Sequence, residues 1–522
     1  PLRESERMSL SRNIATVGGA TVMSRLLGFA RDVGIAQLLG ASALSDAYLA
    51  ALQIPNLFRR LLADGALNSA FVPLWLRKRE QDGTQAARAF GEAALGALLL
   101  GLGLFAVLGS VFAPLLVHLI APGFAVTEER FGLAVTCVRL SIVYVVFAGV
   151  VALWAAVLNA EGRVAKVAAG VVIFNVAFLA FVLALIAAHE TASPRTGVIL
   201  SLAVTISGLA QLLVVGAAMR DLRDAPFRPR FRCSPDVRRF FARALPGMIA
   251  AGIPQLKLMA GAIIASSSAS AVSWLYYANR LYELPLGIVS VALATVLMPK
   301  IATGLRAEAP LDFAKAQSRS FEIALGLALP AALALVILAE PIAAALFQRG
   351  AFDAEDTLAV SAALAAMAMG LPGHAVEKAF GAVSFAHEDT RTPMYAALMG
   401  LAVSIVAALL LFPAHGHVGV AAAIAISGWT GAAILGAQMI RRGWLALEPG
   451  GARRLTLIVA AALLMALCLA VGRHFAAPLA LSALERTIAL AGLIAGGLLV
   501  YAALLHGFGI LRWRAFAASL RP

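Results

Sequence analysis

Long apolar runs recur along the whole chain, and short polar or Gly- and Pro-containing breaks separate them. Most runs reach the roughly 20 residues that a helix needs to cross a bilayer. Turn residues mark several breaks, as at Ala121-Pro122-Gly123 and Glu448-Pro449-Gly450. The pattern predicts an all-α polytopic membrane protein with 14 transmembrane helices. The expected spans are 11–38, 45–76, 89–119, 131–160, 164–188, 197–219, 244–268, 271–299, 316–348, 356–386, 392–413, 416–440, 455–472 and 487–511.

The composition agrees with a membrane protein, because 61% of the 522 residues are hydrophobic and only 13% are charged. A soluble globule of this size needs a more polar surface. The formal net charge of +14 would suggest nucleic acid as the partner of a soluble protein. Here we attribute the charge to membrane topology and expect no nucleic-acid partner. The three cysteines follow no metal-binding or disulfide spacing, and we expect neither a metal site nor a cofactor.

The basic residues predict the orientation in the membrane. Alternate connections carry 29 Lys and Arg residues, whereas the opposite connections carry five, namely Arg130, Arg195, Arg349, Arg473 and Arg486. Cytoplasmic loops are the ones enriched in Lys and Arg. We therefore expect a multi-pass protein of a bacterial inner membrane, with both termini in the cytoplasm.

A short internal repeat suggests two lobes. The segments 65–73 and 291–299 share an Ala-Leu-x-x-x-x-x-Pro pattern and lie 226 residues, or six helices, apart. An even number of helices per repeat keeps both copies in the same orientation, which implies a pseudo-two-fold axis along the membrane normal. The expected division is a tail at 1–10, an N-lobe of helices 1–6 at 11–219, a basic cytoplasmic linker at 220–243, a C-lobe of helices 7–12 at 244–440, and helices 13–14 with the cytoplasmic C-terminus at 441–522.

Several arginines fall inside the predicted spans. A basic side chain at the bilayer centre costs roughly 2.5–3.5 kcal/mol on insertion scales, so we expect it to face protein or a wet cavity. Snorkelling to the headgroups and structural ion pairing are the alternatives. In helix 11–38, Arg25 and Arg31 are accompanied by Ser24 and Asp32, and Asp32 can partly neutralise the two arginines.

Two further predicted spans also contain arginines and acidic residues. Helix 45–76 carries Pro55, which should kink it, together with Asp46, Asn56, Arg59, Arg60 and Asp64. Arg60 and Asp64 are spaced for an ion pair, which leaves Arg59 as the stronger ligand candidate. Helix 271–299 carries Asn279, Arg280 and Glu283, and Arg280 and Glu283 are also spaced for pairing.

The choice of arginine indicates an anionic ligand. A guanidinium group is planar and binds phosphate oxygens through two parallel hydrogen bonds. We expect Arg25, Arg31, Arg59 and Arg280 to bind a phosphate or diphosphate in a cationic cavity. No Walker loop and no zinc-protease motif occurs in the sequence, so we expect a transporter and not an enzyme.

At these residues the chain resembles the MurJ/MviN family of lipid II flippases, within the superfamily of multidrug and oligosaccharidyl-lipid exporters. The segments that carry the resemblance are 24–32, 46–47, 55–60, 66–73, 277–285 and 387–393. The resemblance implies two lobes around a cationic cavity, a hydrophobic groove formed by helices 13 and 14, and lipid II (undecaprenyl diphosphate bearing a disaccharide pentapeptide) as substrate. Family cavity residues match Arg25, Arg31, Arg59 and Arg280, and family acids match Asp32, Asp46 and Glu283.

The expected function is therefore lipid II flipping by alternating access, from the cytoplasmic to the periplasmic leaflet, for peptidoglycan synthesis. A membrane potential that is negative inside favours outward movement of an anion, and we expect transport to be coupled to it. Some relatives place a sodium-binding carboxylate in helix 7, where this chain has Gly261, and this argues against a sodium site. The expected partners are lipid II and the bilayer, with the protein acting as a monomer, alone or in association with the cell-wall synthesis machinery.

Three alternatives stay open at this point. They are a flippase for another prenyl-linked glycan, a drug/cation antiporter of the same superfamily, and a non-transporting scaffold.

Overall fold

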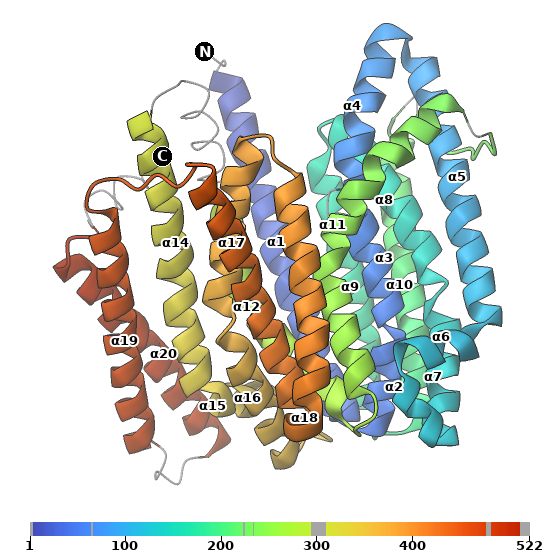
Figure 1. Ribbon diagram of the computed structural model, residues 1–522. Coiled ribbons are helices and arrows are strands. Elements are labelled where there is room, and N and C mark those ends of the chain that lie inside the picture. The colour runs from blue at the N-terminus through green and yellow to red at the C-terminus, as the bar shows by residue number, and fades with distance from the viewer. Residues whose placement is uncertain are drawn as a thin grey trace. The chain divides into compact units, whose positions relative to one another are not determined.

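The computed structural model describes residues 4–63, 66–222, 225–232, 234–293, 310–476 and 482–511. These residues form helices and connections and no strand, which confirms the all-α prediction. They belong to two compact units (Figure 1). The N-terminal unit comprises Pro1–Ser273 with Arg349–Phe352, and the C-terminal unit comprises Trp274–Gln348 with Asp353–Pro522.

The N-terminal unit contains eleven α-helices, a short 3-10 helix and the first turn of a further helix. They are α1 (Glu4–Leu39), α2 (Ala43–Ala51), α3 (Gln53–Ala63), α4 (Ala66–Gln81), α5 (Thr84–Val111), α6 (Ala113–Ile120), η1 (Pro122–Val126), α7 (Glu128–Ser141), α8 (Tyr144–Ala160), α9 (Val164–Ala187), α10 (Pro194–Arg220), α11 (Pro235–Ala265) and the start of α12 (Ala271–Ala292).

Proline explains two of the breaks in these helices. The predicted span 45–76 is divided into α2, α3 and α4, and α2 ends at Ala51. Pro55 has no N–H to donate to the carbonyl of Ala51, so the helix is interrupted there, as its sequence predicted. Pro114 likewise leaves the Ser110 carbonyl without a helical donor, and the Arg139 Nε donates to that oxygen at 3.2 Å.

The C-terminal unit contains the rest of α12 and seven further helices. They are α14 (Pro310–Ile337), α15 (Ala339–Phe347), α16 (Ala354–Ala368), α17 (Leu371–Ala386), α18 (Arg391–Arg441), α19 (Gly451–Ala476) and α20 (Ala483–Gly507). Within this unit α17 packs on α18 and α14, and α19 packs on α14 and α20.

The longest helix, α18, contains a turn where the sequence predicted a boundary between two spans. Gly416 has φ 54° and ψ −138°, which lies outside the helical region and is favourable only for glycine. The segments before and after it therefore correspond to the predicted spans 392–413 and 416–440.

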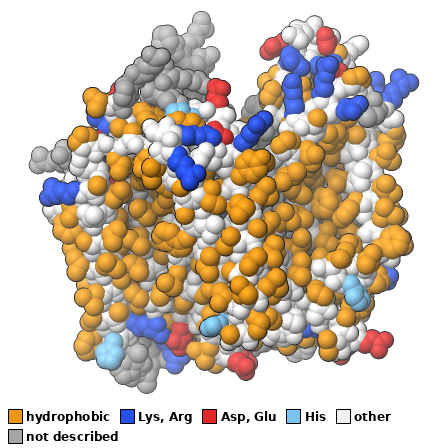
Figure 2. Space-filling view, in the orientation of Figure 1, with side chains coloured by type: hydrophobic (Ala, Val, Ile, Leu, Met, Phe, Trp, Pro, Cys, Tyr) orange, Lys and Arg blue, Asp and Glu red, His pale blue; other side chains and the backbone are white. Residues whose placement is uncertain are grey.

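Apolar side chains cover the sides of the helices in both units, and Lys, Arg, Asp and Glu gather near their ends (Figure 2). Nine helices in the described part of the chain are long and apolar enough to cross a membrane, and the bent pair Pro235–Ile249 and Ala251–Ala265 would be a tenth. Several boundaries lie close to those predicted: α9 ends one residue before the expected 188, and α10 extends 197–219 by three residues at its start and one at its end. The repeat segments 65–73 and 291–299 fall partly outside the described residues.

Candidate functional site

The candidate site in the N-terminal unit begins on α1. Arg25 is exposed, Arg31 is half-buried and Asp32 is buried. The Arg31 Nη2 lies 2.9 Å from the Asp32 Oδ1, and the guanidinium lies 5.2 Å from the centre of the Phe178 ring on α9. Asp32 therefore neutralises Arg31, whereas no ion pair or side-chain hydrogen bond of Arg25 occurs among the described residues.

The face of α1 that carries Ser24 packs on α9. The Asn175 Nδ2 donates to the Ser24 Oγ at 3.0 Å, and the Asn175 Oδ1 lies 3.4 Å from the position of a Cβ on Gly28. Ser24, predicted as a supporting polar residue, thus holds α1 against a neighbouring helix. Asn175 was not among the predicted residues, because its contact crosses 151 positions of sequence.

Three predicted residues lie together on α3. Asn56, Arg59 and Arg60 are half-buried there. Arg59 of α3 and Arg31 of α1 both interact electrostatically with the buried Tyr144 of α8. This shared neighbour places two of the predicted ligand arginines near the same point of the N-terminal unit. Asp64, the expected partner of Arg60, lies outside the described residues.

Asp46 lies in a different part of this unit, where a buried network surrounds it. It is fully buried in the first turn of α2. Its Oδ2 accepts from the Arg130 Nη2 at 2.5 Å, and its Oδ1 accepts from the Ser273 N and Oγ at 2.8 and 2.6 Å. The Arg130 guanidinium also lies 3.8 Å from the centre of the Phe124 ring. Asp46 therefore joins α2, α7 and the start of α12.

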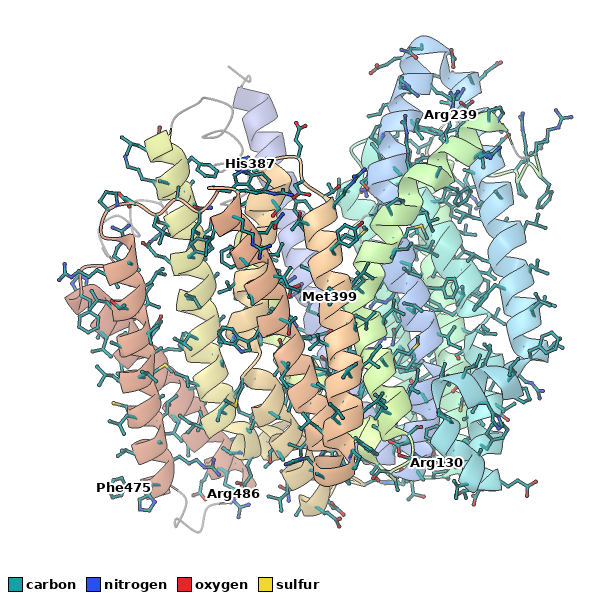
Figure 3. The ribbon with its side chains drawn as sticks, viewed as in Figure 1. Arg130, Arg239, His387, Met399, Phe475 and Arg486 are labelled. Atoms are coloured by element: carbon teal, nitrogen blue, oxygen red, sulfur yellow. The ribbon has the colours of Figure 1, made fainter. Side chains whose placement is uncertain are left out.

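The role of Arg130 could not be recognised from the sequence. Its position suggested an ordinary loop charge, yet it is only 9% exposed. Its partners are 84 and 136 positions away. Arg130 and Arg239 lie at opposite ends of the N-terminal unit (Figure 3), so the Asp46 network lies at the end remote from the basic start of α11.

The predicted residues of the C-terminal unit lie on α12. Arg280 and Asn279 are half-buried, and the Arg280 Nη1 lies 3.7 Å from the Glu283 Oε2, which confirms the expected pairing. The Arg280 Nη2 also donates to the Tyr276 hydroxyl at 2.8 Å. The 3.7 Å separation is longer than a hydrogen bond, so this contact is a loose ion pair.

The chain is similar in sequence and in fold to known proteins. The family model "Lipid II flippase MurJ" matches residues 35–489. The "Probable lipid II flippase MurJ" of Rhizobium meliloti (strain 1021) is 40% identical over 512 residues, which cover 96% of this chain and 94% of that protein. This chain belongs to the lipid II flippase MurJ family.

Further comparisons agree with membership of the MurJ family. The "Lipid II flippase MurJ" of Burkholderia cenocepacia is 33% identical over 464 residues, which cover 88% of this chain and 89% of that protein. A solved structure of lipid II flippase MurJ in an inward closed conformation covers 94% of this chain and 98% of its own, with a TM-score of 0.78 and 23% identity. An inward-facing multidrug MATE transporter covers 80% of this chain and 94% of its own, with a TM-score of 0.67 and 13% identity. These two structural similarities show the fold alone.

The MurJ family model includes Asp46, Arg59 and Arg280 and begins after Arg25 and Arg31. Gly261, the position at which we expected relatives to carry a sodium-binding carboxylate, is buried on α11. Among the described residues, no three His, Cys, Asp or Glu side chains are grouped so that they could hold a metal ion.

Proposed function

We propose that this chain is a lipid II flippase, which moves undecaprenyl-diphosphate-linked disaccharide pentapeptide from the cytoplasmic to the periplasmic leaflet for peptidoglycan synthesis. The observation that carries this proposal is membership of the MurJ family along nearly the whole chain. A flippase is a transporter, and its work is to bind and release its substrate and not to change it covalently.

The proposed binding residues are Arg25, Arg31, Arg59 and Arg280. Their guanidinium groups suit the two phosphates of the substrate, because each offers parallel N–H donors to phosphate oxygens. The exposure of Arg25 and the common neighbour of Arg31 and Arg59 support this assignment. In the proposed site, Asp32 and Glu283 limit the repulsion between arginines when no substrate is bound.

The transport cycle we propose is alternating access between two six-helix lobes, 11–219 and 244–440. The described helices support 14 spans if α2–α4, α5–α6, α7–α8, α14–α15 and α16–α17 each cross the membrane once and α18 crosses twice. The excess of Lys and Arg in alternate connections supports cytoplasmic termini. In this topology the Asp46–Arg130 network lies at the periplasmic end, and its bonds to Ser266 and Ser273 of the proposed C-lobe are the ones that opening at this end breaks.

The prenyl tail is proposed to lie along α19 and α20. Gly492 and Gly496 of α20 have no atom within 4 Å of an added Cβ, whereas Gly497 packs on Leu469 of α19. Leu498 and Leu499 are 60% and 71% exposed. These features support a shallow apolar surface formed by α19 and α20 of the C-terminal unit. We propose that the protein works as a monomer and draws on the membrane potential.

A direct test supplies this chain to cells depleted of their own flippase. Lipid II accessible at the outer face of the inner membrane is then measured with and without the chain. Restored accessibility and growth are expected. A chain that is inserted in the membrane but leaves lipid II inaccessible would overturn the proposal and favour a scaffold or a carrier of another glycan lipid.

A further inference from the structure

We propose that the segment Ala225–Arg232, here called the linker segment, forms a binding surface for the headgroups of anionic phospholipids at the membrane interface. This inference does not rest on the proposed function, because none of its residues belongs to the proposed lipid II site. The segment reads Ala-Pro-Phe-Arg-Pro-Arg-Phe-Arg and connects α10 to α11.

The linker segment has no regular secondary structure, yet it is fixed on the N-terminal unit. The Arg230 N donates to the Glu92 carbonyl at 2.9 Å, and the Arg230 Nε lies 2.6 Å from the Glu92 Oε2. The Trp154 Nε1 donates to the Pro226 carbonyl at 3.3 Å. Two polar anchors from two different helices, α5 and α8, therefore hold its backbone.

Close packing on α5 adds to these anchors. A Cβ on Gly96 would lie 2.3 Å from the Arg230 carbonyl oxygen, and one on Gly91 would lie 2.9 Å from the Pro226 Cβ. After the segment, Phe240 of α11 packs on Phe71 and Phe90 with ring centres 5.7 and 6.2 Å away. The linker segment is thus a fixed part of the protein surface, held near both of its ends. Its arginines therefore occupy defined positions, in addition to any effect of their charge on membrane topology.

The linker segment contacts α5 at the level expected for the lipid headgroups. Beyond Gly96, α5 presents exposed apolar side chains, beginning with Leu100 at 63% and continuing with Leu104 at 57% and Val107 at 62%. Four helical residues from Gly96 to Leu100 span about 6 Å. That is close to the thickness of the interfacial layer on one side of the bilayer core. The linker segment therefore lies where the apolar band of the helix ends.

The charges of the segment are only partly compensated. Glu92 is buried and pairs with both Arg88 and Arg230, so one carboxylate serves two guanidinium groups. Arg228 and Arg232 are exposed, and no side-chain hydrogen bond or ion pair of either occurs within the part of the chain that the structure describes. Lys and Arg side chains gather at this end of the unit (Figure 2).

The remaining side chains suit a lipid surface better than an aqueous ligand. Phe231 is 66% exposed, and Phe227 is 37% exposed beside the Trp154 ring, with which it makes an edge contact at 5.7 Å. Aromatic rings favour the interface between water and hydrocarbon. Guanidinium groups beside them bind phosphate, and clusters of basic residues attract anionic lipids. The combination fits an anionic lipid headgroup with its acyl chains beside α5.

The test measures lipid binding to the full-length protein by native mass spectrometry in detergent, with dioleoylphosphatidylglycerol or dioleoylphosphatidylcholine added. The test variant is Arg228→Gln with Arg232→Gln, which removes two exposed charges that hold no partner among the described residues. The matched control is Arg441→Gln with Arg453→Gln, which removes two exposed arginines, one at the end of α18 and one in the first turn of α19, on the same predicted side of the membrane. Thermal unfolding verifies that both variants fold like the parent.

We expect the parent to retain phosphatidylglycerol over phosphatidylcholine, the test variant to bind phosphatidylglycerol at least about fivefold more weakly, and the control to bind like the parent. Inorganic phosphate and equimolar lipid II should not displace the bound lipid. Equal binding in test variant and parent, or an equal loss in the control, would overturn the proposal. Displacement by phosphate or by lipid II would also overturn it, since the surface would then serve a soluble anion or the transported substrate.

Discussion

At the scale of single residues, the Asp46–Arg130 pair is the feature whose loss should cost most. Asp46→Ala would leave the buried Arg130 guanidinium without its carboxylate, and removing one partner of a buried pair typically costs about 3–5 kcal/mol. We expect a large fall in thermal stability of the purified protein. Arg130→Ala should have a similar effect, and the double variant should lose less than the sum of the two.

The control for this prediction is Arg195→Ala. Arg195 pairs with Glu190 at 3.7 Å, but its side chain is 77% exposed, and exposed pairs of this kind contribute about 0–1 kcal/mol. The prediction would be contradicted if each single variant lost as little thermal stability as this control and the double variant lost the sum of the two. The Asp46–Arg130 pair would then contribute nothing to stability.

His387 should make stability depend on pH. Its ring stacks on Trp444 at 4.1 Å, and its buried Nε2 has no hydrogen-bond partner among the described residues. Burial, and next the positive charge of Arg442, lower its pKa. The folded protein therefore binds fewer protons than the unfolded chain, so stability is full above the unfolded pKa of about 6.5 and is lost as the pH falls below it.

The measurement is the melting temperature at pH 7.5 and pH 5.5. The parent should lose stability over this interval, and His387→Phe, which keeps an aromatic ring against Trp444 but cannot be protonated, should lose less. An identical loss in parent and variant would assign the pH dependence to other groups.

At the scale of elements, the contact of the linker segment with α5 should depend on a single glycine. Gly96→Ala places a methyl group 2.3 Å from the Arg230 carbonyl oxygen, which is backbone and cannot rotate away. We expect a loss of about 1–3 kcal/mol and faster tryptic cleavage in 225–232. Gly101→Ala and Gly103→Ala on the same helix have no atom within 4 Å of the new Cβ, so they should be neutral or slightly stabilising. Similar behaviour of all three variants would contradict this view of the interface.

Local sequence rules predicted the helices and many of their ends, because apolar length, proline and glycine act within one or two turns. Pro55 and Gly416 are examples in which the residue type explains the break. The partners of charged residues were predicted only where they are near in sequence, as for Arg280 and Glu283. Asp46–Arg130, Ser24–Asn175 and Glu92–Arg230 join distant helices, and no spacing rule reveals them.

At the scale of the whole molecule, the membrane potential should bias transport. A potential of 100 mV, negative on the cytoplasmic side, favours outward movement of each negative charge by about 2.3 kcal/mol. Proteoliposomes with an imposed potential of this sign should therefore accumulate more lipid II in the outer-facing leaflet than unpolarised ones, and a reversed potential should lower the amount. Fluorescence of a labelled lipid II under a potassium gradient with valinomycin measures this, and indifference to both signs would exclude the potential as the energy source.

The central claim is that several arginines hold the diphosphate of lipid II during its passage across the membrane. The most direct measurement is the rate of lipid II flipping in proteoliposomes that contain the parent or the variants Arg25→Ala, Arg31→Ala, Arg59→Ala and Arg280→Ala. Arg139→Ala is the matched control, because Arg139 also lies in a predicted span but donates to the Ser110 carbonyl. We predict that each of the four variants folds and loses flipping while the control retains it. Full flipping by all four would contradict the account.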